Sequence, residues 1–273
     1  MKQKTISKPT HLSGIGLHSG QAAAIILSPS APNSGIYFLK EGEKTPATAE
    51  EVRSTQRGTA LGEIAVTEHL LSAVYAMGID NLQIEMTGNE LPAMDGSALP
   101  FVEALEKAQI VEQDEEKIPL TIQKPIKIVE KDASLEVFPC NGFKVNFMVD
   151  FPAVGEQYFS FDLQKDSFKK EIAPARTFGY IEEYELLKER GLARGASFDN
   201  ALVLGKDGYL NTPRFQDELV RHKILDLIGD LALVGRPLLA EIKAVKAGHK
   251  LNTELARQLR QIVKTESKEV NKK

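Results

Sequence analysis

The chain has 273 residues, is 42% hydrophobic and carries a formal net charge of −4, so it has room for one large domain or two of ordinary size. Its Lys and Arg residues are scattered among acids, which argues against a nucleic-acid partner. A single cysteine excludes an internal disulfide, and no stretch reaches the ~20 apolar residues of a membrane span, so we expect a cytoplasmic protein.

The first half of the chain alternates short strands with helices. Residues 4–40 place short apolar runs between Gly, Pro and Ser, a pattern typical of antiparallel strands. A helical apolar period over 66–78, with Thr67 as the N-cap and Gly78 as the C-cap, predicts a helix. Further elements are expected as a strand at 81–85 and a helix at 100–108.

The acidic segment 112–117 marks a change of composition. We place a domain boundary there, with one domain over 1–112 and a second over 117–264. The second half repeats the element order of the first, although no residue-level repeat is visible. Its expected elements are strands at 120–129, 134–138, 143–149, 201–204 and 238–245, helices at 181–190, 221–230 and 253–264, and a loop at 247–252. Residues 265–273 are almost all polar, and we expect a disordered tail.

The segment 221–230 carries the strongest chemical signal. In a helix, the step from His222 to Asp226 puts imidazole and carboxylate on one face, and Asp230 falls on roughly the same face. For an isolated pair at this spacing, a surface ion pair is the commoner explanation. Apolar residues cover the rest of this helix, and histidine is rare in the chain, so both observations weaken the ion-pair explanation and leave open that the pair is half of a metal site.

Glu68 and His69 fall in the first turn of the helix predicted over 66–78. Taken alone, Glu68 is explained by the favourable interaction of a carboxylate with the helix dipole. Adjacent helical residues point about 100° apart, however, so one could bind a metal while its neighbour reached water on that metal. The arrangement is chemically useful only if a second segment supplies more ligands.

Six segments together resemble the UDP-3-O-acyl-N-acetylglucosamine deacetylases, zinc enzymes at the committed step of lipid A synthesis. They are GIGLHSG from Gly14, TEHLLSAV from Thr67, LPAMDGSALPFV from Leu91, ARTFGY from Ala175, RHKILDLIGDL from Arg221 and AGHKLN from Ala247. The segments occur in family order and span most of the chain. One departure is that Val66 and Thr67 are transposed relative to the commoner Thr-Val order, which leaves Glu68 and His69 in place.

The resemblance implies a catalytic centre residue by residue. His69, His222 and Asp226 match the zinc ligands. Glu68 matches the general base, and His249 matches the general acid. The implied reaction removes the N-acetyl group from a UDP-linked acylated amino sugar, and we expect only transient contact with a membrane surface.

The resemblance also implies supporting and substrate-binding residues. Thr177 matches the residue that helps to hold the oxyanion, and Lys223 and Asp230 match groups that assist catalysis or contact substrate. Four residues are expected at the substrate, namely His18, Phe178, Gly195 and Lys223. His18 lies among glycines that suggest close approach of the backbone to a ligand, although a plain hairpin explains the glycines nearly as well.

The implied fold class is α+β. It has two similar domains, each a mainly antiparallel sheet with packed helices, and the helices are sandwiched between the two sheets. Residues 180–205 suit an insertion that helps to form a passage for the acyl chain, although ordinary core packing explains its apolar residues nearly as well. Those residues are Ile181, Tyr184, Leu187, Leu192 and Phe198. The chain ends soon after its last helix, so we expect no fused dehydratase domain.

The chemistry of these residue types agrees with hydrolysis. Two imidazoles and one carboxylate leave a tetrahedral zinc ion with an open position for water. Two rivals remain open. A non-haem iron oxygenase uses the same donor set, and in a metal-free ligand-binding protein the histidines would be structural. Glu68 and His249 favour hydrolysis, because an oxygenase has no evident need for that acid and base pair.

Overall fold

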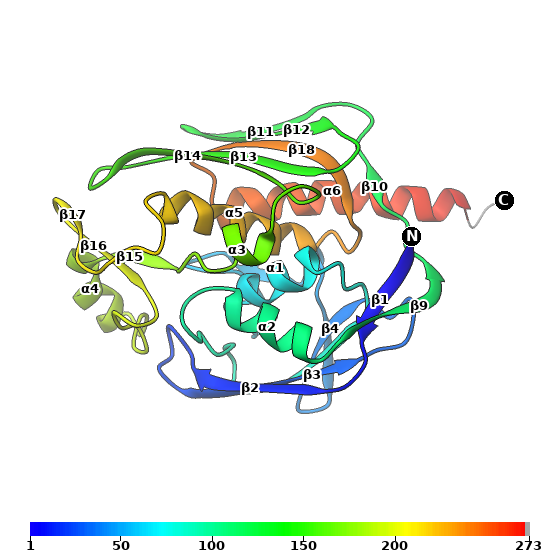
Figure 1. Cartoon of the computed structure of the whole chain (residues 1–273), viewed down its shortest axis with the longest axis horizontal. Helices are drawn as coiled ribbons and strands as arrows, with labels where there is room; N and C mark the ends of the chain where they lie inside the picture. Colours follow the sequence, from blue (N-terminus) through cyan, green and yellow to red (C-terminus); the bar gives the residue numbers. More distant parts are fainter. Residues whose placement is uncertain (271–273) are drawn as a thin grey trace.

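The computed structural model describes residues 1–270 as two sheets with helices between them (Figure 1). One sheet has the strand order β2-β3-β8-β4-β5 and the other has the order β11-β12-β18-β13-β14. The first contains β2 (Thr10–Ile15), β3 (Ala22–Pro29), β4 (Ile36–Lys40), β5 (Glu43–Pro46) and β8 (Leu82–Thr87). The second contains β11 (Ile126–Glu130), β12 (Ala133–Pro139), β13 (Phe143–Phe151), β14 (Gly155–Asp162) and β18 (Leu238–Val245). The predicted α+β sandwich is confirmed.

The two sheets have the same topology. In the first, β8 lies between β3, to which it is antiparallel, and β4, to which it is parallel. In the second, β18 lies in the same way between β12 and β13. Each of these central strands follows one helix and precedes another, namely α1 (Glu68–Ala76), α2 (Leu99–Lys107), α5 (Glu218–Ala232) and α6 (His249–Val270). Helices α1 and α5 therefore occupy equivalent places in the two halves.

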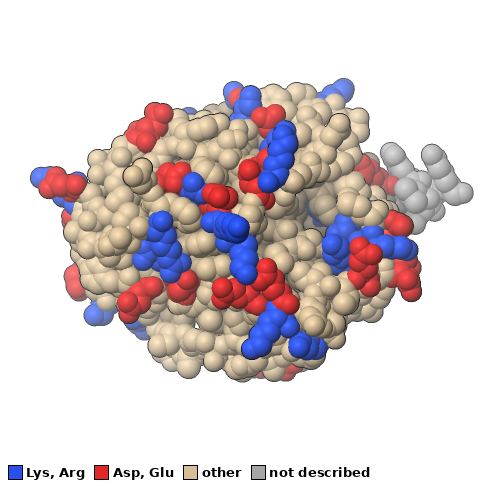
Figure 2. Space-filling model, viewed as in Figure 1, with Lys and Arg blue, Asp and Glu red and all other residues tan. Residues whose placement is uncertain are grey.

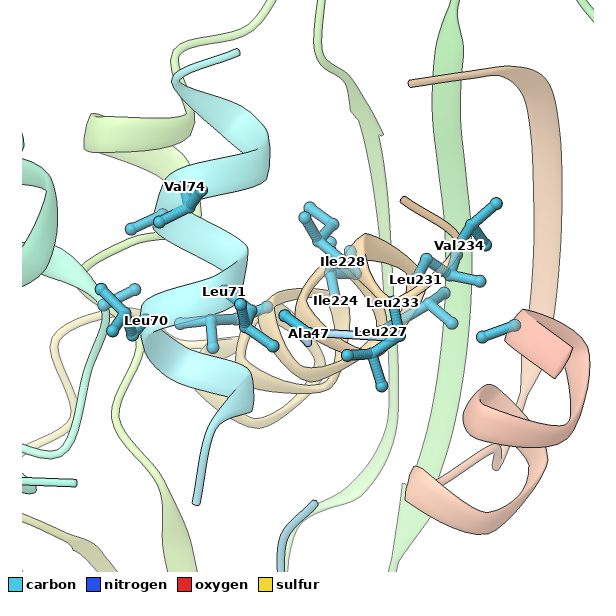
Figure 3. Close-up of a cluster of buried hydrophobic side chains, with 14 of the residues drawn as sticks. Ala47, Leu70, Leu71, Val74, Ile224, Leu227, Ile228, Leu231, Leu233 and Val234 are labelled. Carbon is cyan, nitrogen blue, oxygen red and sulfur yellow. The ribbon is translucent and has the colours of Figure 1, made fainter. Parts of the chain in front are cut away.

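Helices α1 and α5 pack against each other in the middle of the sandwich. Leu71 projects from α1 toward Ile224 and Leu227 of α5 (Figure 3), and all three side chains are buried. Each such side chain contributes about 1.5–3 kcal/mol when it is fully buried. This contact fixes the first turn of α1 beside the middle of α5.

The acidic segment in which we place the domain boundary is mostly a strand. Residues 112–116 are the second part of β9 (Ile110–Glu116), which pairs antiparallel with β1 (Lys2–Ile6). The N-terminal amino group also lies 2.9 Å from Glu116 Oε2. Local polarity suggested a domain boundary, but the backbone of this segment is hydrogen-bonded to β1, a strand distant in sequence. The division into two domains remains our proposal.

Helix α6 begins earlier and continues further than the sequence suggested. The predicted loop over 247–252 contains its first turn, in which the N–H of Asn252 donates to the carbonyl of Gly248. Residues 265–270, expected in a disordered tail, continue the helix. Residues 271–273 of that predicted tail lie outside the described residues.

The second half contains more short elements than expected. The strand predicted over 120–129 is divided at Pro125, which has no N–H for a sheet, into β10 (Leu120–Thr121) and β11. Strand β14 was missed. The expected insertion over 180–205 and its flanks contain β15 (Phe178–Tyr180), η2 (Ile181–Glu183), α4 (Tyr184–Glu189), β16 (Leu202–Gly205) and β17 (Gly208–Tyr209). The remaining elements are η1 (Ala49–Glu51), β6 (Val52–Ser54), β7 (Ala60–Leu61) and α3 (Phe168–Glu171).

The surface on the face shown in Figure 2 carries both signs of charge. Lys and Arg side chains alternate with Asp and Glu, and the two signs are interspersed over both halves. Within residues 1–270, none of the helices combines the length and the hydropathy that crossing a bilayer requires.

Candidate metal centre and active site

Helices α1 and α5 bring the three predicted metal ligands together. His69 lies in the first turn of α1, and His222 and Asp226 lie one turn apart on α5. Asp226 Oδ1 is 3.3 Å from His222 Nε2 and 3.9 Å from His69 Nε2. The two imidazole rings meet edge to face with their centroids 5.0 Å apart. All three side chains are buried. The structure therefore brings together residues from the two halves as the sequence suggested.

The protonation states of the two histidines suit metal binding. Burial, together with the nearby ring of His222, lowers the pKa of His69 to about 3. Burial also lowers the pKa of His222. His222 Nδ1 lies 3.1 Å from the carbonyl oxygen of Ala175, and a proton on Nδ1 leaves the Nε2 lone pair directed toward Asp226. Neutral imidazoles with a free nitrogen are the form that binds a divalent cation.

The charge and hydrogen bonding of Asp226 show whether a metal ion would fit between these three side chains. Burial alone would raise its pKa, but His222, Lys223 and His249 outweigh burial and lower the pKa. Its Oδ1 is buried and, among the described residues, has no hydrogen-bond partner. An ionised, unpartnered and buried oxygen is costly unless a cation neutralises it. The three residues therefore fit a divalent cation held by two nitrogens and one oxygen.

Lys223 lies on the other side of the same carboxylate. Its Nζ donates to Asp226 Oδ2 over 2.6 Å. This contact orients the carboxylate so that Oδ1, rather than Oδ2, faces the two imidazoles. The lysine therefore supports the arrangement of the donor atoms without supplying one of them.

Glu68 is held beside this cluster by backbone contacts. The N–H of Thr59 donates to Glu68 Oε2 over 3.0 Å, while Oε1 lies 3.8 Å from His249 Nε2. Burial raises the pKa of Glu68 to about 7, with the carboxylate of Asp226 adding to the rise and His249 opposing it. Thr67 stands at the N-cap position, but its hydroxyl donates to the carbonyl of Thr59 and does not cap the helix. A carboxyl group with this pKa can accept a proton near neutral pH.

His249 faces Glu68 from the first turn of α6. Its Nδ1 lies 2.9 Å from Asp230 Oδ2, and its Nε2 lies 3.8 Å from Asp226 Oδ2. Burial would lower the pKa of His249, but the carboxylates of Asp230, Asp226 and Glu68 outweigh burial and raise the pKa to about 9. These carboxylates therefore favour the protonated ring of His249, which can donate a proton from Nε2.

The segment with Thr177 and Phe178 is fixed to the start of α5. Arg176 and Glu218 form a buried ion pair of 2.9 Å, and the backbone N–H of Arg176 also donates to Glu218. This anchor places Phe178 edge-on to His222, with ring centroids 5.9 Å apart. The backbone N–H of Thr177 donates to Gly96 O. Phe178 thus lies against the cluster, while contact of the Thr177 hydroxyl with substrate stays a prediction.

His18 and Gly195 meet at a junction between the two halves. His18 Nε2 lies 2.9 Å from the carbonyl oxygen of Arg57, and its Nδ1 accepts from the N–H of Ala193 over 3.3 Å. The N–H of Gly195 donates to the carbonyl of Leu17 over 3.0 Å. Both residues therefore hold the insertion against the N-terminal half, and substrate contact by them stays a prediction.

The insertion has both buried and exposed apolar residues, and Leu202 and Leu204 near its end are buried and pack in a small core with Leu219. None of the residues in η2 and α4 is buried, and Ile181 and Phe198 are 40% and 54% exposed. Core packing therefore does not explain Ile181 and Phe198, whereas Tyr184, Leu187 and Leu192 are half-buried and the acyl passage stays a prediction.

Two residues that touch the site were missed by sequence reasoning. Thr59 donates its hydroxyl to Asp230 Oδ1, and Asn252 donates from Nδ2 to Asp230 Oδ2 over 2.9 Å. Asn252 lies in the AGHKLN segment, three residues after His249, so helical spacing could have signalled it. Thr59 stands before a two-residue strand, and no pattern in the sequence links it to α5.

The α+β sandwich and its buried donor cluster, with Glu68 and His249 beside it, are those of a metal-dependent hydrolase. The family model for UDP-3-O-acyl N-acetylglycosamine deacetylase matches residues 3–261, and the chain belongs to this family. Three similar relatives are named UDP-3-O-acyl-N-acetylglucosamine deacetylase. The protein of Syntrophotalea carbinolica is 42% identical (94% of this chain, 87% of the relative), and that of Coxiella burnetii strain Dugway is 43% identical (95% and 90%). That of Myxococcus xanthus is 42% identical (94% and 86%).

Proposed function

We propose that this protein hydrolyses the N-acetyl group of UDP-3-O-acyl-N-acetylglucosamine, releasing acetate and the free amine in lipid A biosynthesis. The observation that carries the proposal is the buried cluster of His69, His222 and Asp226, flanked on one side by Glu68 and His249. Hydrolysis of an amide needs activation of water, stabilisation of an oxyanion and protonation of the leaving nitrogen. The cluster and its neighbours contain groups for all three.

The metal that we propose is zinc, held by His69, His222 and Asp226. Two nitrogens and one carboxylate oxygen match the donor set of catalytic zinc sites, which keep a position open for water or substrate. Bound there, zinc supplies a Lewis acid that makes water acidic and polarises an amide carbonyl. The unpartnered Oδ1 of Asp226 supports this assignment.

Glu68 acts as the general base in this proposal. Its Oε2 is occupied by the N–H of Thr59, so Oε1 is the atom that accepts the proton of the attacking water. Thr177 supplies a hydroxyl that donates to the oxyanion as the carbonyl carbon becomes tetrahedral.

His249 acts as the general acid. Asp230 holds its Nδ1, which leaves the protonated Nε2 facing Glu68 and Asp226. When the carbon–nitrogen bond breaks, Nε2 gives its proton to the departing nitrogen of the amino sugar. Before then, the imidazolium stabilises negative charge that develops beside it.

The remaining assignments concern substrate binding. Phe178 packs on His222 and is placed to contact the sugar, and Lys223 adds a positive charge beside the reacting amide. His18 and Gly195 hold the insertion over 180–205, whose half-buried and exposed apolar side chains suit an acyl chain and transient contact with a membrane surface. We propose a cytoplasmic enzyme with no nucleic-acid partner, in keeping with the net charge of −4.

One set of measurements separates this function from its rivals. Elemental analysis of purified protein should give one zinc per chain, and acetate should be released from UDP-3-O-acyl-N-acetylglucosamine equally in air and under nitrogen. Turnover that requires oxygen would support an iron oxygenase. Folded protein that binds no stoichiometric metal and releases no acetate would support a metal-free binding protein.

A further inference from the structure

Thr59 is a buried residue that touches both sides of the candidate active site. Its backbone N–H donates to Glu68 Oε2 over 3.0 Å, and its hydroxyl donates to Asp230 Oδ1. The hydroxyl oxygen also lies 3.4 Å from His249 Nδ1. Within residues 1–270, Thr59 alone is hydrogen-bonded to both Glu68 and Asp230. It therefore links the proposed base to the carboxylate that holds the proposed acid.

The position of Thr59 is itself fixed. Its carbonyl oxygen accepts from both the backbone N–H and the hydroxyl of Thr67, each over 3.1 Å. The preceding residue, Gly58, has a φ of +152°, and a Cβ there would lie 2.9 Å from Glu68 Oε1. The chain thus passes too close to Glu68 for a larger residue, and every polar atom of Thr59 has a partner in the protein.

The hydroxyl of Thr59 controls the orientation of the Asp230 carboxylate. Two donors, His249 Nδ1 and Asn252 Nδ2, share Asp230 Oδ2. In the described part of the chain, Oδ1 receives only the hydroxyl of Thr59. Because these three contacts act on both oxygens, they prevent the carboxylate from rotating. A rotated carboxylate would turn the His249 ring and move Nε2 away from the leaving nitrogen.

We infer that Thr59 is a positioning residue that aligns the general base and the general acid across the two halves of the protein. This inference rests on the proposed function. Thr59 makes no hydrogen bond to His69, His222 or Asp226, so it acts on proton transfer and leaves metal binding to others. Its removal should therefore lower kcat while metal content and KM stay close to those of wild type.

Two substitutions separate the hydroxyl from the rest of the side chain. Thr59→Val keeps the shape and the backbone N–H, and we expect kcat to fall about 10- to 10²-fold, the range for losing a hydrogen bond to a charged group. Thr59→Ser keeps the hydroxyl and should restore kcat to within about threefold of wild type. Thr253→Val is the matched control, because Thr253 is equally buried and its hydroxyl donates only to the carbonyl of Lys250. It should leave kcat unchanged.

A double-mutant cycle tests whether Thr59 acts through Asp230. Asp230→Asn removes the charged acceptor, so adding Thr59→Val to it should lower kcat no further, whereas independent roles would give multiplied losses. Imidazole ¹⁵N spectra give a readout that does not depend on turnover. The Nδ1–H of His249 should be protected from exchange in wild type and in Thr59→Ser, and should lose that protection in Thr59→Val.

The outcomes for Thr59 and for the proposed function are distinct. If wild-type protein releases no acetate, the proposed function fails. If wild type is active and Thr59→Val equals it, the positioning role is overturned. The role is also overturned if Thr59→Ser is as impaired as Thr59→Val, if Thr59→Val loses its metal, or if the cycle is additive.

Discussion

The backbone of Glu68 passes so close to Gly229 that a Cβ at position 229 would lie 2.1 Å from the carbonyl oxygen of Glu68. Glycine at this place in α5 lets α1 approach closely. That approach sets the distance between His69 on one helix and His222 and Asp226 on the other. The geometry of the proposed metal centre thus depends on a residue that supplies no ligand.

The first prediction concerns this contact. Gly229→Ala in a helix interior would ordinarily stabilise by about 1 kcal/mol, because alanine has the better helix propensity. Here the added methyl forces α1 away from α5, and we expect destabilisation of about 1–3 kcal/mol together with weaker metal binding. Denaturant unfolding and metal titration check both effects. An increase in stability with unchanged metal affinity would show that the two helices can separate freely.

The second prediction distinguishes His222, a proposed metal ligand on α5, from its neighbour Lys223, which is not a proposed ligand. His222→Ala should lose metal and activity together, because one of three donor atoms is gone. Lys223→Ala should keep one equivalent of metal, since Lys223 contacts Asp226 Oδ2 and leaves Oδ1 to the metal, but it should bind substrate more weakly. Elemental analysis after dialysis and measurement of KM check this division. Equal loss of metal in both variants would contradict it.

The third prediction is a bell-shaped dependence of kcat/KM on pH. The base must be deprotonated, so activity rises as pH increases through the pKa of Glu68, about 7 in the metal-free protein. The acid must be protonated, so activity falls as pH increases through the pKa of His249, about 9. A bound divalent cation favours the deprotonated forms of Glu68 and His249. The rising and falling limbs of the pH profile should therefore lie at lower pH in the metal-loaded enzyme than these metal-free pKa values give.

The same two residues are distinguished by their variants. Glu68→Ala and His249→Ala should both keep zinc, and each should lose about 10²- to 10⁴-fold in kcat, the usual worth of general acid or base catalysis. Coupled groups share macroscopic pKa values, so the wild-type pH profile alone does not assign a limb to a residue. The pH profile of the activity that remains in each variant makes that assignment. If activity still rises through the same low-pH limb in Glu68→Ala, Glu68 is not the general base. If activity still falls through the same high-pH limb in His249→Ala, His249 is not the general acid.

The last prediction concerns the insertion. Leu192→Trp should narrow the proposed passage for the acyl chain and lower kcat/KM for the acylated substrate by more than about tenfold. A tenfold change is about the smallest discrimination that one added or missing methylene group produces in an apolar pocket. The unacylated analogue should be affected much less. Ile118→Trp is the control, because Ile118 is an exposed apolar residue outside the insertion. If both substrates respond alike to Leu192→Trp, the passage does not involve this residue.

The sequence by itself determined those features that local spacing controls. The four-residue step from His222 to Asp226 places both side chains on one helical face whatever the rest of the chain does. The same holds for Glu68 and His69 at the start of an apolar helical period. The ordered motifs then gave the family, and with it the sandwich of two similar halves that the strand order confirms.

Only the tertiary structure decided which distant residues complete the site. Thr59 reaches Asp230 because Thr59 is hydrogen-bonded to the start of α1 and α1 packs against α5, and nothing in the local sequence encodes that contact. The first turn of α6 was predicted as a loop, and its side chains His249 and Asn252 bond to Asp230 in the fold. Periodicity depends on neighbours along the chain, whereas these contacts depend on strand order and helix packing between residues far apart in sequence.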